Sequence, residues 1–372
     1  MASALISAGE PSGDRAASRV VRRLRQAGVA SFGLGGPACD AAGMETCVRA
    51  EEHSAMGVLD VAARATSVVR SMSVLRREAR ARRPGVAILV NYTEFNTRLA
   101  AALRGVGVRI VWYAAPQVWA WRPRRGRRLA RLVDTMAVVL PFEEPLWRAH
   151  GVDARYVGHP SLEGLAPAAR GAARARLGLA GDMAIALLPG SRAHEVRRLL
   201  PAMLAAVRLL APRGPDVRVL LSQSLGEPHL RHARMLADCE GIGVHEVGSE
   251  EGAAPLLAAF DVSLCASGTA SLEAAVAGAA PVVTYRLDPL SALVARALLR
   301  TPHVALPNVL LGRAAFPELL QEAARPERMA AALEGLLDRS DAARADCAAV
   351  REALGAVHEP SRKVAEMACA WL

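Results

Sequence analysis

The chain has 372 residues, of which 52% are hydrophobic and 22% are charged, a composition typical of a globular protein with room for two domains. Its formal net charge of +10 predicts attraction to polyanions, so charge alone admits nucleic acid, an anionic membrane and phosphorylated substrates. Aromatic residues make up only 4%, and the sequence contains no zinc-finger or RNA-recognition pattern. Nucleic-acid binding is therefore the least favoured of these three alternatives.

The first half of the chain is predicted to alternate strands and helices, beginning with an apolar strand at residues 4–8. A glycine-rich turn follows, but it matches neither the dinucleotide fingerprint nor the P-loop. Its polar side chains stand where a parallel sheet would present a ligand site, and they equally suit the cap of the next helix. The candidate residues of this turn are Glu10, Ser12, Gly13 and Asp14.

Residues 54–83 are predicted to form a helix with an apolar stripe and a dense basic face. The stripe includes Val68, Met72 and Leu75, and arginines such as Arg76 stand behind it. This pattern is typical of an interfacial helix that lies on anionic lipid. It also fits a core helix with a solvated basic face, and the pattern alone leaves both interpretations open.

A second polar cluster follows the fully apolar strand predicted at residues 86–90. Asn91, Glu94 and Asn96 come directly after it, at the carboxyl end where α/β sheets bind ligands. Further strands are expected at residues 109–113 and 135–140. Between them the chain carries Trp119, Arg122 and a run of arginines from 124 to 131.

A break near residues 161–180, rich in Ala, Gly and Arg, is predicted to be the linker to a second α/β half. That half opens with a buried strand that ends at Leu188, followed by a turn and a helix from about His194. The turn should leave backbone N–H groups free beside a cation, which suits a phosphate, although an ordinary corner with a solvated arginine has the same pattern. Its residues are Pro189, Gly190, Ser191 and Arg192.

Later elements of this half are less regular. Pro201 interrupts the helical pattern, so it either kinks the helix or marks its real start. The strand at residues 262–266 runs into a second helix N-terminus suited to an anion, formed by Ser267, Gly268 and Thr269. Residues 306–310 read as a loop, and the helices after Pro326 as a tail that packs back across both domains.

No targeting segment is expected, because the apolar start lacks a basic flank, and no run reaches the roughly 18 apolar residues of a membrane span. The six cysteines stand at scattered spacings without a C-x-x-C pair. They favour reduced thiols over disulfides or a metal framework. We therefore expect a cytoplasmic protein, either soluble or resting on a surface, with no metal site.

Several short motifs, found in order along nearly the whole chain, resemble the lipid-A-disaccharide synthase family. The most specific is Pro116-x-Val118-Trp119-Ala120-Trp121-Arg122, and others are Ser7-Ala8-Gly9-Glu10-x-Ser12-Gly13-Asp14, Leu140-Pro141-Phe142-Glu143, Leu187-Leu188-Pro189-Gly190-Ser191-Arg192, Ala266-Ser267-Gly268-Thr269-Ala270 and Leu306-Pro307-Asn308. The resemblance implies an inverting GT-B glycosyltransferase, an α/β fold of two Rossmann-like domains whose parallel sheets face a central cleft. We place an acceptor and membrane-facing domain at residues 1–165, a UDP-sugar-binding domain at 166–345 and a C-terminal helix at 346–372.

The activity implied by the resemblance is transfer of 2,3-diacylglucosamine from its UDP derivative to 2,3-diacylglucosamine 1-phosphate, forming a β-1,6-linked disaccharide and UDP, without a cofactor. The implied UDP pocket contains Glu273 as the ribose partner, together with Gly190, Ser191, Arg192, Glu195, Ser267, Gly268, Thr269, Arg286 and Asn308. The implied substrate-binding residues of the first half are Ser12, Gly13, Asn96, Trp119 and Arg122. The resemblance also favours a peripheral protein on the anionic cytoplasmic face of the inner membrane, with residues 54–83 in contact, no nucleic acid as partner, and a homodimer formed through the C-terminal region.

One position departs from the family pattern. The family normally carries an aspartate, its favoured general base, where this chain has Asn91, and a carboxamide cannot take a proton. Loss of a positioned base typically costs ~10²–10⁴-fold in rate. Glu94 could serve instead, or Glu10 or Asp14, or the protein is a weakly active UDP-sugar- or lipid-binding relative. A related enzyme with another acceptor, or a UDP-sugar epimerase, is the remaining alternative.

Overall fold

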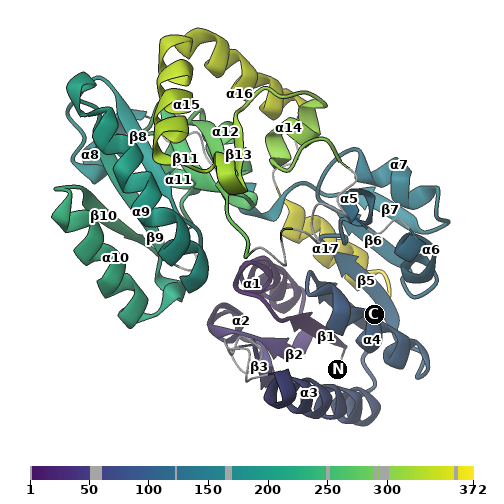
Figure 1. Cartoon of the computed structure of the whole chain (residues 1–372). Coiled ribbons are helices and arrows are strands. Elements are labelled where there is room, and N and C mark those ends of the chain that lie inside the picture. Colours follow the sequence, from purple (N-terminus) through teal and green to yellow (C-terminus); the bar gives the residue numbers. More distant parts are fainter. Residues whose placement is uncertain are drawn as a thin grey trace. The chain divides into compact units, whose positions relative to one another are not determined.

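The computed structural model describes residues 2–50, 61–121, 124–163, 170–248, 252–288, 292, 301–355 and 359–372. The chain divides into two compact units (Figure 1). Unit 1 comprises residues 1–163 and 357–372, and unit 2 comprises residues 164–356. The domain boundaries predicted from sequence, at 165/166 and 345/346, stay predictions, and so do the roles assigned to the domains.

Unit 1 contains a seven-stranded, all-parallel sheet with the order β3-β2-β1-β4-β5-β6-β7. The strands β1, β4 and β5 in the middle of the sheet are mostly apolar and buried, because helices cover a parallel sheet on both faces. Its elements are β1 Ser3–Ala8, α1 Pro11–Gln26, β2 Ala30–Gly35, α2 Pro37–Ala42, β3 Glu45–Arg49, α3 Val61–Arg82, β4 Val86–Val90, α4 Thr93–Arg104, β5 Arg109–Tyr113, α5 Val118–Trp121, α6 Arg124–Ala130, β6 Thr135–Val138, α7 Glu143–Arg148, β7 Asp153–Tyr156, the 3-10 turn Pro160–Leu162 and α17 Pro360–Cys369.

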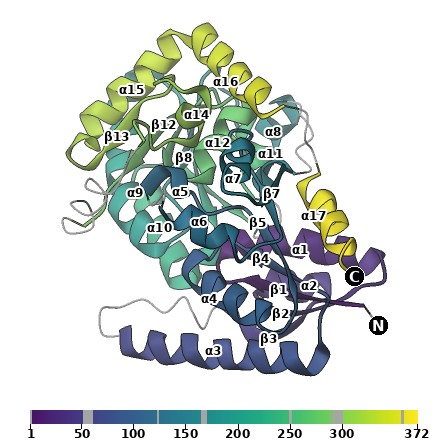
Figure 2. The ribbon, with the colours of Figure 1, turned by 90° about the vertical axis from the view of Figure 1, so that its right-hand side faces the viewer.

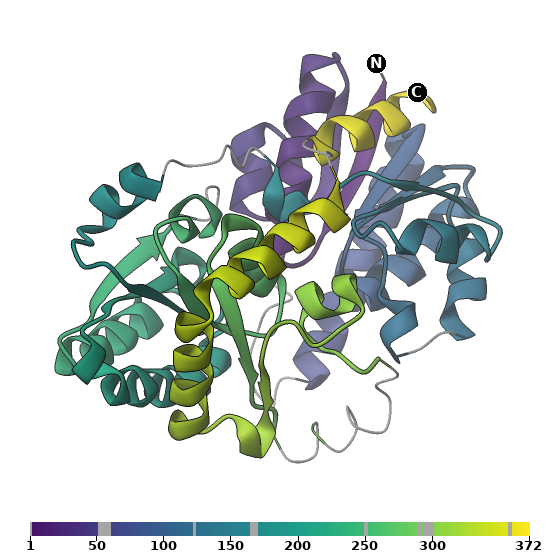
Figure 3. The ribbon, with the colours of Figure 1, turned by 90° about the horizontal axis from the view of Figure 1, so that it is seen from above.

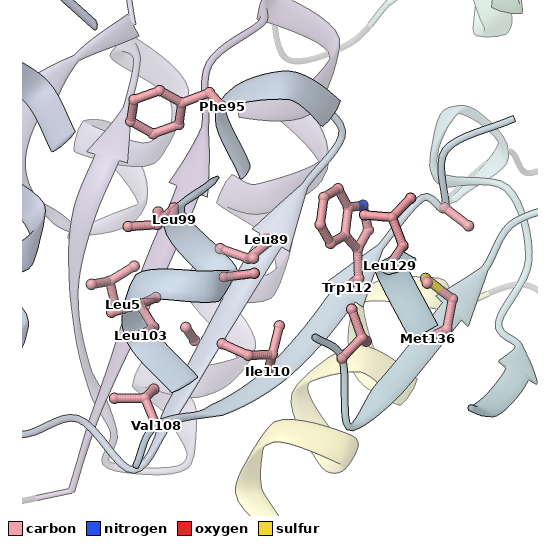
Figure 4. Packing of buried hydrophobic residues seen from close by; sticks show 14 of the residues in the cluster. Leu5, Leu89, Phe95, Leu99, Leu103, Val108, Ile110, Trp112, Leu129 and Met136 are labelled. Atoms are coloured by element: carbon pink, nitrogen blue, oxygen red, sulfur yellow. The ribbon is translucent and has the colours of Figure 1, made fainter. Parts of the chain in front are cut away.

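One core cluster of unit 1 lies between this sheet and the helices on one of its faces (Figure 4). Leu89 and Ile110 from adjacent strands pack near Leu99 and Leu103 of α4, and Trp112 lies near Leu129 and Met136. These side chains are at most 2% exposed. Because the core fixes β4, β5 and α4, it also fixes the loops at the carboxyl ends of these strands.

The C-terminal helix α17 belongs to unit 1, where it packs against α1 and β5 (Figure 3). The Arg23 guanidinium donates to Glu359 at 2.8 Å, and the Ser361 hydroxyl donates to Glu163. Val364 and Ala368 are buried on the same helix. The helix therefore completes the layer that covers one face of this sheet.

Helix α3 lies beside β3 and α4 (Figure 2). Leu75 and Ala79 are buried, and Met72 packs against the core, as expected for a core helix. Exposed positions carry arginines, and Val69 is 68% exposed. Residues 54–60 of the predicted helix lie outside the described residues. No helix in the described ranges is long and apolar enough to cross a membrane.

Unit 2 contains a six-stranded, all-parallel sheet with the order β10-β9-β8-β11-β12-β13. Its elements are α8 Arg170–Leu177, β8 Ala184–Leu188, α9 Ala193–Leu209, the 3-10 turn Ala211–Arg213, β9 Asp216–Ser222, the 3-10 turn Gln223–Leu225, α10 Glu227–Cys239, β10 Gly243–Val247, α11 Ala254–Leu257, β11 Val262–Ala266, α12 Thr269–Ala277, β12 Ala280–Tyr285, α14 Leu306–Leu311, β13 Glu318–Leu320, the 3-10 turn Gln321–Ala323, α15 Pro326–Asp338 and α16 Ser340–Leu354.

Two local expectations for unit 2 are corrected. The predicted loop after residue 306 begins as helix α14, whose proline lies in the first turn, where its missing N–H costs no hydrogen bond. Part of the predicted linker is helix α8.

Pro201 lies inside α9, which begins well before it, so this proline does not mark the start of the helix. The expected face of Met329, Leu333 and Leu336 on α15 is buried.

Candidate active site

The predicted polar turns lie at corresponding places in the two sheets. In unit 1 the strand order reverses direction between β1 and β4, and in unit 2 it does so between β8 and β11. Ligands of open α/β sheets bind beyond the carboxyl ends of strands at this switch point, because the connections leave in opposite directions there. Glu10 and Asn91 follow the two central strands of unit 1, and Gly190 and Ser267 follow those of unit 2.

The turn after β4 has an unusual backbone that brings it against the turn after β1. Asn91 and Tyr92 both adopt left-handed conformations, with φ of 47° and 41°. Asparagine tolerates this region better than most residues. A Cβ added to Gly9 would lie 2.3 Å from the Tyr92 ring, so only glycine allows this approach. The close contact places Glu10, the next residue, beside the Asn91–Tyr92 turn.

Two of the predicted site residues are fully engaged within the protein. The Asp14 carboxylate accepts the N–H groups of Gly36, Ala38 and Cys39 at 2.8–3.2 Å, which caps helix α2. Asn96 is fully buried: it accepts the Ser7 hydroxyl at 2.7 Å and donates to the carbonyls of Ser7, Val90 and Asn91. These two residues therefore hold the turns in place, and neither presents a free polar group to a substrate.

The remaining carboxylates of this edge differ in their surroundings. Glu94 forms an ion pair with Arg125 of α6, and its side chain is 66% exposed. Glu10 is half-buried and precedes α1, but its side chain makes no capping hydrogen bond. Ser12 is half-buried on the first turn of α1, and Gly13 is buried, where an added Cβ would lie 3.7 Å from the Val90 carbonyl oxygen. Glu10 is thus the carboxylate at the switch point that is not used to cap its own helix.

Trp119 lies on the short helix α5 after β5, where its indole N–H donates to Glu143 at 3.0 Å. The Phe142 ring meets the indole edge-on with the ring centroids 5.1 Å apart. Burial raises the pKa of Glu143 to about 7. Glu143 belongs to the Leu140-Pro141-Phe142-Glu143 motif of the family resemblance, but the sequence does not predict it as a site residue. The predicted residue Arg122 lies outside the described residues.

In unit 2 the turn after β8 is closed by a carboxylate. Glu195 accepts the N–H groups of Ser191 and Arg192 at 3.2 and 3.3 Å, so the expectation that these two donors are free is wrong. Gly190 has φ of +113°, and a Cβ there would lie 2.3 Å from the Glu195 carboxylate. Tyr285, at the end of β12, donates its hydroxyl to Glu195 at 3.4 Å.

The Arg192 side chain itself remains accessible. It is 57% exposed and lies 3.4 Å from the Glu195 carboxylate, at the long end of hydrogen-bond range. Burial and the Glu195 charge raise the pKa of Tyr285, so its hydroxyl stays protonated and can donate. Glu195 and Tyr285 thus hold the turn in shape while the guanidinium can reach an anion.

The turn after β11 is more open. Gly268, with φ of +152°, precedes α12, and a Cβ built on it would point into open space. The Ser267 N–H donates to Thr284, and the Ser271 hydroxyl donates to the Gly268 carbonyl. The first N–H groups of α12, starting at Thr269, have no partner within the helix and can bind an anion.

Three further predicted residues lie around this edge. Glu273 is buried on α12, and Arg286 is half-buried directly after β12. Asn308 is fully buried: it donates to Phe316 and Glu318 at 2.8 Å and accepts the Phe316 N–H at 2.9 Å. Asn308 therefore joins α14 to β13, and any role in binding acts through that position. Across the described ranges, no three His, Cys, Asp or Glu side chains gather closely enough to hold a metal ion.

Comparison with known proteins gives a consistent result. Residues 4–370 match the family model described as lipid-A-disaccharide synthetase. Over 365 residues the chain is 42% identical to a lipid-A-disaccharide synthase of Anaeromyxobacter sp. (strain K), covering 96% of this chain and 93% of the relative. A synthase of the same name from Myxococcus xanthus (strain DK1622) is 41% identical over 330 residues, covering 88% and 85% of the two chains.

Solved structures share the fold at much lower identity. The structure of Acinetobacter baumannii MurG matches with a TM-score of 0.61 and 13% identity, covering 100% of both chains. With two parallel α/β sheets, the chain has the GT-B architecture, and this prediction is confirmed.

Proposed function

The chain belongs to the lipid-A-disaccharide synthase family and is a glycosyltransferase of lipid A biosynthesis, and we propose that it transfers 2,3-diacylglucosamine from UDP-2,3-diacylglucosamine to 2,3-diacylglucosamine 1-phosphate. The products are the β-1,6-linked disaccharide 1-phosphate and UDP. The observation that carries this assignment is the position of both groups of candidate residues at the switch points of their sheets. The alternative of a relative without enzymatic activity is not favoured.

The proposed donor site is in unit 2. When the anomeric carbon is attacked, its bond to the UDP phosphate breaks, and negative charge grows on the pyrophosphate. Preorganised donors stabilise such charge more in the transition state than in the bound substrate. Arg192 and the free N–H groups at the start of α12 are suited to this role. Glu273 and Arg286 lie near the same strand ends and are proposed to contact the nucleoside.

The proposed base is Glu10 of unit 1. It would take the proton from the acceptor 6-hydroxyl as the oxygen bonds to the anomeric carbon. Asp14 is a poor choice because three N–H donors already hold its carboxylate, and Glu94 is paired with Arg125. Asn91 can still orient the acceptor through its amide. Trp119 is proposed to contact the acceptor sugar.

The assignment is tested by incubating the full-length protein with both lipid substrates in detergent micelles. Disaccharide and UDP should appear in equal amounts, and omission of the acceptor should stop UDP release. UDP release without disaccharide would indicate a donor hydrolase, and an unchanged donor with intact UDP binding would contradict the assignment.

Membrane contact through α3 is proposed as electrostatic, at the cytoplasmic face of the inner membrane. Its apolar stripe packs into the core, whereas Arg70, Arg76 and Arg80 are exposed and have no ion pair within the described ranges. Each basic residue near an anionic surface contributes ~1 kcal/mol to the free energy of membrane binding.

Dimerisation through the C-terminal region stays a prediction, which sedimentation velocity would test.

Replacing both Arg76 and Arg80 with Glu is expected to weaken binding to phosphatidylglycerol vesicles by at least ~30-fold, because two attractive charges of ~1 kcal/mol each become repulsive. Co-sedimentation with vesicles measures this. The control is Arg231→Glu with Arg328→Glu, which makes the same net change on exposed helices of unit 2. An equal loss of vesicle binding in both double variants would mean that binding depends only on net charge. Helix α3 would then not be the membrane contact.

A further inference from the structure

The structure assigns to Glu143 the role of a positioning residue for the transfer reaction: its buried carboxylate holds the Trp119 indole, and through it helix α5, in the geometry that accepts the sugar. This inference rests on the proposed function, because it takes Trp119 as an acceptor contact. Glu143 itself is fully buried, so we expect it to act through Trp119 and not by direct contact with the substrate.

The two carboxylate oxygens of Glu143 have different partners. Oε1 accepts the Trp119 indole N–H at 3.0 Å. Oε2 accepts the backbone N–H groups of Val139 and Leu140 at 3.3 and 3.1 Å. One oxygen therefore fixes the loop between β6 and α7, and the other reaches across to α5. The carboxylate joins the carboxyl ends of two adjacent strands, β5 and β6, through a single side chain.

A carboxylate is a costly way to make this link. Burial raises the pKa of Glu143 from its ordinary value of 4.5 to about 7, so the ionised form that accepts all three donors carries a desolvation cost. Folding stability from this group is therefore lost, not gained, as the pH rises toward about 7. If the side chain only filled space, an apolar residue of similar size would pack there at a lower cost in free energy. What the carboxylate provides in addition is a fixed orientation of the Trp119 indole.

Tyr156 on β7 and two residues of α7 are titratable groups beside Glu143. Tyr156, at the end of β7, has its pKa raised to about 12 by burial and by the Glu143 charge, so it stays neutral. On α7 itself, Glu144 and Arg148 pair with each other at 2.9 Å. Protonation of Glu143 itself weakens the indole hydrogen bond, because the neutral carboxyl group is a poorer acceptor than the carboxylate.

Glu143→Gln separates the two functions of the carboxylate. A glutamine has one acceptor oxygen, and if that oxygen keeps the two backbone N–H groups, its NH₂ faces the indole N–H. The side chain then keeps its hydrogen bonds with the loop between β6 and α7, and Trp119 is released. Trp119→Phe removes the indole donor from the other side and leaves the hydrogen bonds from Val139 and Leu140 to Glu143 intact. The two variants should therefore have the same defect by independent routes.

The test is acceptor-dependent transfer by the full-length protein, with UDP affinity measured separately. Each single variant should lose ~10–100-fold in kcat/KM for the acceptor, the loss expected for a hydrogen bond to a charged group. The double variant should lose no more than Trp119→Phe alone. UDP affinity should be unchanged, and the matched control Glu144→Gln should behave as wild type.

The pH profile is the second readout. Wild-type transfer should fall as the pH drops through about 7, because protonation of Glu143 removes an acceptor oxygen, and both single variants should lack this dependence. Wild-type activity with unchanged kcat/KM and pH profile in Glu143→Gln would overturn the inference while leaving the proposed function standing. Additive losses in the double variant would also overturn it. A wild-type protein without transfer activity would instead contradict the proposed function.

Discussion

Glu10→Gln is expected to lower kcat for transfer by ~10²–10⁴-fold, the usual contribution of a positioned general base. The substitution keeps the size of the side chain and removes only its ability to take a proton from the acceptor hydroxyl. UDP affinity should not change, because the proposed donor site lies in unit 2. Single-turnover measurements at saturating substrate separate this chemical step from binding.

The matched control for this variant is Glu94→Gln. Glu94 lies at the same sheet edge, is exposed and pairs with Arg125, an arrangement typically worth no more than ~1 kcal/mol. Its loss should reduce transfer by less than ~10-fold. A large defect in Glu94→Gln together with a mild one in Glu10→Gln would move the base to Glu94.

Arg192→Ala is expected to lower kcat/KM for the donor by ~10²–10³-fold, the range found when one donor to a developing oxyanion is removed. The fold should survive, because the side chain is largely exposed and the turn is held by the hydrogen bonds that backbone N–H groups donate to Glu195. The transfer assay measures the loss in kcat/KM, and calorimetric titration measures the affinity for UDP.

Arg197→Ala is the control, since Arg197 is an exposed arginine on the same helix, beyond its first turn. Both variants remove one positive charge from α9, so a difference between them reports position and not net charge. Equal UDP affinity in Arg192→Ala and wild type would remove Arg192 from the phosphate site.

The buried strands were predictable from sequence. Residues 86–90 and 262–266 are continuous apolar runs because they form central strands of parallel sheets, and both are buried throughout. The half-buried edge strand β13 has no such run and was missed. Helix α14 was read as a loop because its second residue is a proline, which a first helical turn tolerates.

The candidate site was predictable only in part. Sequence spacing located the turns after β1, β4, β8 and β11, but strand order is a tertiary property, so their shared position at the switch points was not visible. Residue types also did not reveal which polar groups are already engaged. The partners of Asp14 lie 22 to 25 residues along the chain, and those of Asn96 include Ser7, 89 residues away.

Glu143 was overlooked for the same reason. Its partner Trp119 lies 24 residues earlier, and only the tertiary fold brings the two side chains together. The signal available in the sequence was its place in the Leu140-Pro141-Phe142-Glu143 motif, which the family resemblance already contained.

The measurement that tests the account most directly is transfer by the wild-type protein beside Asn91→Asp. Aspartate, like asparagine, is enriched in the left-handed backbone region found at this position, so the variant tests chemistry and not folding. If Glu10 is the base, the wild-type protein transfers the sugar, and Asn91→Asp changes kcat by much less than the ~10²-fold that gaining a positioned base supplies. A wild-type protein that becomes active only with Asp at position 91 would contradict the account.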